Sequence, residues 1–223
     1  MSKVQVAIMG RGGFAREVFW ALQNGRTHPD GKALEPIAFV DLEADPAGCY
    51  GVPVVDLDSL DRSVFLMCGI GGMPEIKQRI MDDAEAAGFR TCPPVVFHDV
   101  RMGPNVKLGE GTIVCAGSIL TVDITLGRHV AVNLDCTIGH DVVIGDYATL
   151  SPGTHLSGNV RLGRCAYLGT GCAVIEGKSI DAHAVVGAGA VVTKDVPRQA
   201  LVVGVPAQIK KEHRALACEV SSE

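Results

Sequence analysis

The second half of the chain carries an aliphatic residue at every sixth position. The fifteen positions are Leu108, Val114, Leu120, Leu126, Val132, Ile138, Ile144, Leu150, Leu156, Leu162, Leu168, Val174, Ile180, Val186 and Val192. Four residues after each of them the side chain is mostly small, as at Ser118, Cys136 and Ala148. A period of six fits neither an α-helix, whose faces repeat every 3.6 residues, nor a meander of hairpins, which needs turn signals at longer spacing.

A period of six fits a chain that turns a corner after every six residues. Three such sides make a coil of eighteen residues, with the aliphatic side chain inside a prism and the small one at the corner. Only Tyr147 and Tyr167 are aromatic between residues 106 and 196, and both fall outside the predicted core positions. A narrow prism excludes such rings, so the pattern predicts about five stacked coils at a strand spacing of ~4.8 Å.

The first ninety residues follow a different pattern, in which buried strands alternate with helices. Residues 3–9 predict a strand, residues 10–25 a glycine loop that opens a helix, and residues 36–41 a second strand. Residues 63–72 give a third strand and a second glycine turn before another helix. This order predicts a small parallel sheet of Rossmann type over residues 1–94, followed by the repeat domain over residues 95–223.

Several glycines and one carboxylate fall at the carboxyl ends of these predicted strands. They are Gly10, Gly12, Gly13, Gly71 and Asp41. In parallel α/β sheets, backbone N–H groups and a helix N-terminus at this edge can hold phosphate. Gly10, Gly12 and Ala15 also fit the pattern G-x-G-x-x-A. The alternative is that the glycines only form tight turns between strand and helix.

Composition narrows the classes of partner. The formal net charge of −5 argues against nucleic acid as the main partner, because phosphate backbones require a basic surface. No run of about 18 apolar residues occurs, so we expect no membrane insertion. The eight cysteines form no CxxC pair, which is typical of free thiols and predicts a cytoplasmic protein.

The segment "CTIGHDVVIGDY", residues 136–147, interrupts the repeat with a histidine beside a carboxylate. Counting from Ile138, His140 faces outward, and Gly158 lies eighteen residues later in the next coil. An imidazole beside a bare backbone N–H suits acyl transfer, which needs a base and a donor for the oxyanion. Asp141 can orient the ring only if the chain bends after Gly139.

The remaining ionisable candidates are weaker. We expect the other histidines to be solvated; they are His28, His98, His129, His155, His183 and His213. No cysteine is placed as a nucleophile, since Cys136 faces inward and Cys115 follows the core residue Val114. Direct transfer without an acyl-enzyme is therefore expected.

The motifs "VNLDCTIGHDVVIGDY", "SGNVRLG", "YLGTG", "VVGAGAVV" and "VVGVPAQ", behind a small α/β domain, resemble the PglD/NeuD-like sugar acetyltransferases. These belong to the hexapeptide-repeat acyltransferases, which form a left-handed parallel β-helix. The resemblance implies that the α/β domain binds a nucleotide-linked amino sugar and that acetyl-CoA lies along the β-helix between subunits of a homotrimer. It implies no metal.

Residue by residue, the resemblance makes His140 the general base, Asp141 its partner and Asn133 the active-site asparagine. The resemblance also implies that the backbone of Gly158 faces the thioester, and that the residues whose backbone meets the pantetheine arm are Thr170, Gly187 and Ala188. Two positions depart from the family pattern. Many members have histidine where the substrate-binding loop has Phe14, and some have a second histidine where this chain has Thr149.

These residues predict N-acetylation of a nucleotide-linked amino sugar, and three alternatives stay open. The first is O-acetylation of a sialic acid or related sugar. The second is a zinc-dependent carbonic anhydrase on the same helix, which needs three converging histidines with a close pair that this sequence lacks. The third is a non-catalytic scaffold or sugar sensor.

Overall fold

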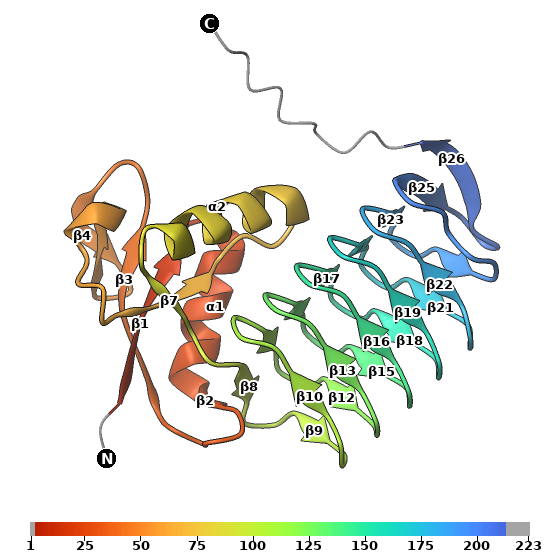
Figure 1. Ribbon diagram of the computed structural model, residues 1–223, viewed down its shortest axis with the longest axis horizontal. Helices are drawn as coiled ribbons and strands as arrows, with labels where there is room; N and C mark the ends of the chain where they lie inside the picture. Colours follow the sequence, from red (N-terminus) through yellow and green to blue (C-terminus); the bar gives the residue numbers. More distant parts are fainter. Residues whose placement is uncertain (1–2, 213–223) are drawn as a thin grey trace, which may run out of the picture.

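The computed structural model describes residues 3–212, in two units joined side by side (Figure 1). The first unit is a six-stranded sheet in the order β4-β5-β3-β1-β6-β7. Its elements are β1 (Val4–Met9), α1 (Gly13–Asn24), β3 (Leu34–Val40), β4 (Asp45–Cys49), β5 (Val52–Val55), η1 (Leu57–Ser59), β6 (Phe65–Cys68), α2 (Pro74–Ala86) and β7 (Arg90–Thr91). Only the β4–β5 pair is antiparallel. The three predicted strands are confirmed as β1, β3 and β6.

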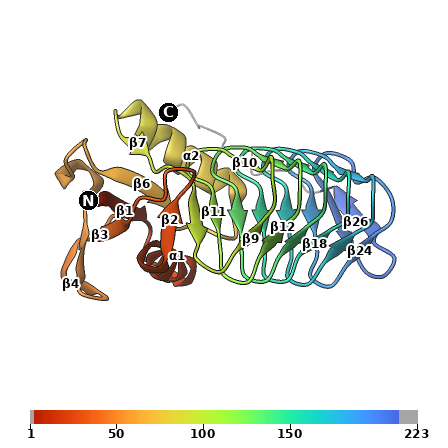
Figure 2. The ribbon, with the colours of Figure 1, turned by 90° about the horizontal axis from the view of Figure 1, so that it is seen from below.

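The second unit is a left-handed parallel β-helix, which confirms the prediction from the repeat. Its strands are β8 (Val95–Phe97), β9 (Arg101–Met102), β10 (Lys107–Leu108), β11 (Ile113–Val114), β12 (Ile119–Leu120), β13 (Thr125–Leu126), β14 (Ala131–Val132), β15 (Thr137–Ile138), β16 (Val143–Ile144), β17 (Thr149–Leu150), β18 (His155–Leu156), β19 (Arg161–Leu162), β20 (Tyr167–Leu168), β21 (Ala173–Val174), β22 (Ser179–Ile180), β23 (Val185–Val186), β24 (Val191–Val192), β25 (Ala200–Val203) and β26 (Gln208–Glu212). From β10 to β21, each strand pairs in parallel with the strand eighteen residues later, and the coils stack along the long axis (Figure 2).

The core of this helix is the predicted aliphatic column. From Val114 to Val192 every sixth residue is buried, and only Leu108, in the first coil, is partly exposed. Corner residues such as Cys136, Val142 and Ala148 are fully buried as well. The column therefore fills the prism as the period of six predicts.

Three rows of corners run along the prism, and each is named here after one residue. The Asn133 edge holds corners 133–136, 151–154, 169–172 and 187–190, and the His140 edge holds corners 121–124, 139–142, 157–160 and 175–178. The Tyr147 edge holds corners 127–130, 145–148, 163–166 and 181–184. Helix α2 lies along the Tyr147 edge, where Lys77 and Glu85 contact the solenoid (Figure 1).

One sheet of the solenoid is bounded by antiparallel pairs at both ends. β2 (Gly25–Thr27), from the first unit, pairs antiparallel with β8, and β26 pairs antiparallel with β25. The predicted domain boundary at residue 94 falls directly before β8, so this pairing joins the two units. Within residues 3–212, no helix is long and apolar enough to cross a membrane.

Candidate active site

His140 stands on the corner between β15 and β16, where its side chain is half exposed. Its Nδ1 lies 2.8 Å from Oδ2 of Asp141. The backbone supplies the bend that this contact requires, because Asp141 adopts the left-handed conformation with φ of 59°. The two neighbouring side chains therefore meet at the corner, as the sequence allowed but did not establish.

Gly158 lies directly against the imidazole in the next coil. A Cβ atom at this glycine would stand 2.4 Å from both Cε1 and Nε2 of His140, so any side chain here would force the ring to move. Among the described residues, none accepts a hydrogen bond from the Gly158 N–H. The Gly158 carbonyl accepts one from Gly177 at 3.0 Å, which fixes the peptide chain there.

The arrangement at His140 has the elements of a general base. A carboxylate only accepts hydrogen bonds, so the Asp141 contact places the proton of a neutral ring on Nδ1 and leaves the Nε2 lone pair free. Nε2 and Cε1 of the ring lie next to Gly158, whose N–H has no acceptor among the described residues. A base and an amide donor thus lie side by side in neighbouring coils of the His140 edge.

The other residues expected at the acetyl-transfer site lie elsewhere on the prism. Asn133, Thr170, Gly187 and Ala188 all belong to the Asn133 edge. The Oδ1 of Asn133 accepts a hydrogen bond from the N–H of Leu134 at 2.8 Å. Thr170 and Ala188 are exposed, and the Thr170 carbonyl accepts from the Gly189 N–H. One protomer therefore brings together His140, Asp141 and Gly158, but not these four residues.

The predicted glycine turns meet at the carboxyl ends of β1 and β6. Gly10 has a φ of 93°, and its N–H donates to the Val40 carbonyl at 2.7 Å. Gly12 and Gly13 are exposed at the N-terminus of α1. Phe14 packs under the second turn, where a Cβ on Gly71 would lie 3.0 Å from its ring.

A cavity of about 640 Å³ opens beside these turns. It is lined by Met9, Gly10, Val40, Asp41, Leu42, Asp56, Leu57, Ile70, Arg79, Ile80 and Asp83. The carboxylate of Asp41 lies 3.3 Å from Nε of Arg11. Of the expected substrate residues, Gly10 and Asp41 line the cavity, while Gly12, Gly13, Phe14 and Gly71 belong to the turns next to it.

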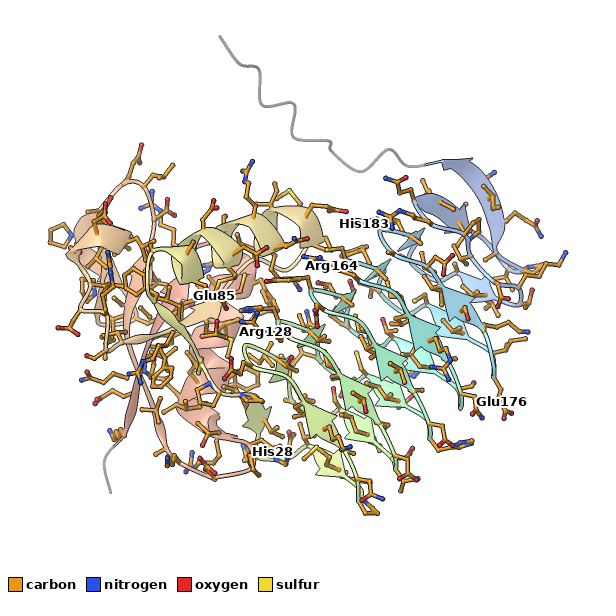
Figure 3. All side chains as sticks on the ribbon, in the orientation of Figure 1. His28, Glu85, Arg128, Arg164, Glu176 and His183 are labelled. Atoms are coloured by element: carbon orange, nitrogen blue, oxygen red, sulfur yellow. The ribbon has the colours of Figure 1, made fainter. Side chains whose placement is uncertain are left out.

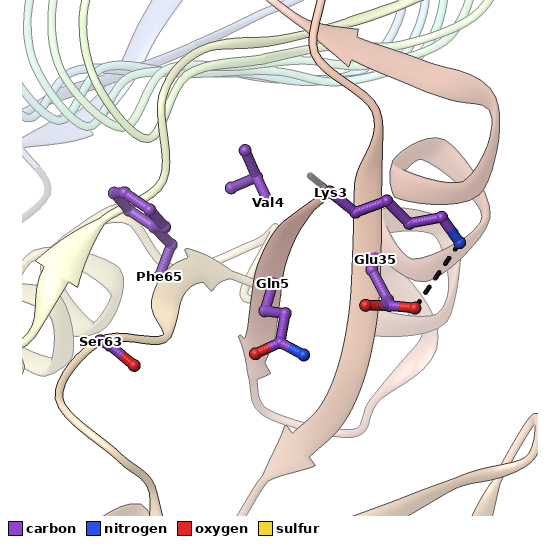
Figure 4. A pocket seen from close by; sticks show the side chains of 6 residues that line it. All are labelled: Lys3, Val4, Gln5, Glu35, Ser63 and Phe65. Atoms are coloured by element: carbon purple, nitrogen blue, oxygen red, sulfur yellow. Dashed lines mark ion pairs between the residues drawn. The ribbon is translucent and has the colours of Figure 1, made fainter. Parts of the chain in front are cut away.

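A second hollow of about 620 Å³ lies at the opposite, amino ends of the strands. Lys3, Gln5, Glu35, Ser63 and Phe65 line it with Val4, and Lys3 forms an ion pair with Glu35 at 3.6 Å (Figure 4). It has no glycine turn and no helix N-terminus. In parallel sheets ligands bind at the carboxyl ends, so the cavity beside Asp41 is the candidate.

Two histidines contradict the expectation of solvated side chains. His129 is 1% exposed beneath α2, and His183 is half buried with its Nδ1 3.1 Å from Glu75. Both face outward from the prism, but α2 covers that edge, which the period of the solenoid does not encode. His98 and His155 are exposed as expected, His28 is half buried, and His213 lies outside the described residues.

The sequence raised two other kinds of site, a cysteine nucleophile and a zinc site. Burial raises the pKa of Cys136 to about 11 and of Cys115 to about 12, so both thiols stay protonated near neutral pH. In the part of the chain that the structure describes, no three His, Cys, Asp or Glu side chains gather as a metal site.

Comparison with known proteins begins with the sequence, which no family model matches. A galactoside O-acetyltransferase from Lactococcus lactis subsp. lactis (strain IL1403) is 33% identical over 114 residues, which are 49% of this chain and 54% of that enzyme. The chain thus spans about half the length of this curated relative.

Solved structures match nearly the whole chain. The acetyltransferase domain of PglB from Neisseria gonorrhoeae FA1090, in complex with acetyl coenzyme A, is 28% identical and covers 93% of this chain and 100% of that one, with a TM-score of 0.83. PerB from Caulobacter crescentus, in complex with CoA and GDP-perosamine, is 35% identical and covers 93% of this chain and 97% of that one, with a TM-score of 0.81. With this identity along the full β-helix and α/β unit, the chain belongs to the PglD/NeuD-like sugar acetyltransferases of the hexapeptide-repeat superfamily.

Proposed function

We propose that the protein transfers the acetyl group of acetyl-CoA to the amine of a nucleotide-linked amino sugar, with His140 as the general base. One observation carries the proposal: the His140 ring, oriented by Asp141, lies against the side-chain-free Gly158. The similar PerB structure contains CoA and GDP-perosamine, which supports this substrate class.

The proposed step is a direct transfer. The sugar amine attacks the thioester carbonyl while Nε2 of His140 takes the amine proton, and the Gly158 N–H donates to the oxyanion. Collapse of the tetrahedral intermediate breaks the C–S bond. The imidazolium then returns its proton to the CoA thiolate, so the products are the N-acetyl sugar and CoA.

We further propose that the site is completed by a second copy of the chain. Asn133, Thr170, Gly187 and Ala188 lie on a different edge from His140, and a closed ring of three prisms would place one copy's Asn133 edge against the next copy's His140 edge. Acetyl-CoA would lie between the two edges. Exposed small residues there, such as Ala188 and Gly189, leave room for a pantetheine arm.

The cavity beside Asp41 is the proposed place of the nucleotide. The N–H groups at Gly12 and Gly13, at the N-terminus of α1, would hold the phosphates, and Asp41 would accept from ribose hydroxyls. The described cysteines are all free thiols, which fits a reducing cytoplasm, where acetyl-CoA is available.

The test is thiol release from acetyl-CoA across UDP-, dTDP- and GDP-linked amino sugars, free sialic acids and galactosides. We expect turnover with one nucleotide-linked amino sugar and an N-acetyl product by mass spectrometry. The galactoside O-acetyltransferase relative favours a second candidate, O-acetylation of a sugar, which an O-acetyl product would support. If none of the acceptors gave thiol release, both candidate activities would be contradicted and a non-catalytic role would be favoured.

A further inference from the structure

One side of α2 contacts the Tyr147 edge with one polar residue per coil. Glu85 meets His129 at 3.3 Å, and Asp82 accepts from the Tyr147 hydroxyl. Gln78 accepts from the Cys165 thiol at 3.4 Å, and Glu75 meets His183 at 3.1 Å. We call these four contacts the α2 row. Its two ends are seen in Figure 3, at Glu85 beside Arg128 and at His183.

All four contacts of the α2 row can form because ten residues of the helix span nearly the same distance as three coils of the solenoid. From Glu75 to Glu85 an α-helix rises about 15 Å, at 1.5 Å per residue. From His183 to His129 the solenoid descends three coils, about 14 Å at the strand spacing. The rings of His129 and Tyr147 stack with centroids 4.9 Å apart, which is one coil. The helix is therefore held in register over three coils.

Lys77 lies between Glu75 and Gln78 on α2 and is 2% exposed. Its Nζ donates to Oγ1 of Thr149 at 2.9 Å and to the Ala148 carbonyl at 3.2 Å. Burial lowers its pKa to about 8, with Cys68 and Cys165 as the titratable groups that act on it. Breaking the partners of a buried cation is costly, so these two bonds hold α2 to one coil.

A different side of α2 forms a wall of the candidate nucleotide cavity. Arg79, Ile80 and Asp83 line that cavity, and the helix starts directly after the glycine turn at Gly71. The same helix thus contacts the solenoid on one side and the cavity on the other. Met81 and Ala84 of α2 share a hydrophobic core with the sheet residues Met9 and Val40, so a slip of this unit along the Tyr147 edge would move the cavity by the same distance.

We propose that Lys77 is a positioning residue, which fixes α2 in register on the solenoid and thereby sets the distance between the nucleotide cavity and the acetyl-transfer site. The inference rests on the proposed function. Reacting atoms must approach to about 3–3.5 Å, and a misplacement of about 1 Å can cost 10²-fold in rate. A slip of one coil, ~4.8 Å, would separate them completely.

The test compares Lys77→Ala and the isosteric Lys77→Met with Lys3→Ala, a control whose ion pair lies at the far end of the sheet. We expect Lys77→Ala to lower kcat for the amino sugar about 10-fold or more. The KM for acetyl-CoA and the Kd of the free nucleoside diphosphate should change less than twofold, because neither binding surface is altered. Lys77→Met keeps the packing but loses both hydrogen bonds. Its kcat should therefore lie between that of the parent and that of Lys77→Ala.

A second measurement does not depend on turnover. Hydrogen exchange of the α2 amides should accelerate in Lys77→Ala and not in Lys3→Ala. A folded Lys77→Ala protein with the parent's kcat, or with unchanged α2 exchange, would overturn the positioning role. A parent protein that acetylates nothing would count against the proposed function alone, and the exchange data would still decide whether Lys77 anchors the helix.

Discussion

The His140 edge and the Tyr147 edge are built from the same backbone corner and differ in what covers them. His140 and Asp141 occupy the same two corner positions as Arg128 and His129, and the second residue of each pair is left-handed, with φ of 59° and 54°. The His140 side chain is 52% exposed, whereas that of His129 is 0% exposed. A repeating backbone therefore does not by itself decide which histidine can act on a ligand.

The residues in the neighbouring coil account for the rest of the difference. Eighteen residues after His140 stands Gly158, without a side chain, and eighteen after His129 stands Tyr147, whose ring stacks on the imidazole. Burial lowers the pKa of His129 to about 4, although contact with Glu85 opposes that change. One edge keeps a histidine accessible beside a backbone N–H that has no acceptor within residues 3–212, and the other uses a neutral histidine for packing.

The largest expected effect comes from removing the accessible histidine. His140→Ala should lower kcat roughly 10²- to 10⁴-fold, because the attacking amine loses its base. The unfolding midpoint should stay near that of the parent, since the ring is half exposed. Steady-state thiol release measures the effect, with the exposed His98→Ala as the matched control. A His140→Ala protein that retains full turnover would exclude the base role.

An intermediate effect is expected when the two edges are made alike by adding a side chain at Gly158. Its φ is not in the left-handed region, so Gly158→Ala should fold, but the new Cβ would meet the His140 ring at 2.4 Å. The ring must turn away, and we expect kcat to fall on the order of 10²-fold, as for a displaced catalytic group. The measurements are steady-state turnover and the unfolding midpoint, of which only turnover should fall. An unchanged kcat would mean that the close approach of His140 and Gly158 plays no part in catalysis.

The smallest effect belongs to the covered histidine and appears only as a dependence of stability on pH. The unfolded chain protonates His129 near pH 6.5, but the folded protein does so only near pH 4. The unfolded state thus binds more protons in this window, and the free energy of unfolding should fall by about 1 kcal/mol from pH 6.5 to 5.5.

The matching variant is His129→Asn, which should lose this slope while being less stable at every pH. Glu85, whose pKa is lowered, titrates at more acidic pH and does not explain the slope in this window. Denaturant unfolding at a series of pH values gives the comparison. An identical slope in both proteins would show that His129 does not titrate as its burial requires.

The solenoid was predictable because its order is local. Ile138 and Ile144 enter the core, and Gly158 meets His140, since both facts follow from counting six and eighteen residues. The contact between His140 and Asp141 was conditional, because it depended on a left-handed corner that a sequence pattern does not show.

The Tyr147 edge was not predictable from the same count. A side chain that faces outward from a prism is not necessarily exposed to solvent. The residues of α2 that contact His129 and His183 lie 44 and 108 residues earlier in the chain. A stripe of polar residues at 75, 78, 82 and 85 was the available signal. It looks like an exposed helix face until its partners are known. The placement of Asn133 on a different edge from His140, by contrast, follows from the count, because the corners that begin at residues 133 and 139 are six residues apart.

The antiparallel strands at both ends of the solenoid bear on how copies of the chain can associate. A stack of parallel coils exposes unpaired N–H and C=O groups at its first and last strand, and such groups can template pairing with another chain. β2 and β26 each reverse the strand direction, so the nine-stranded sheet presents no parallel coil at either end. In this sheet, the two short strands thus cover the edges at which a further parallel strand could pair.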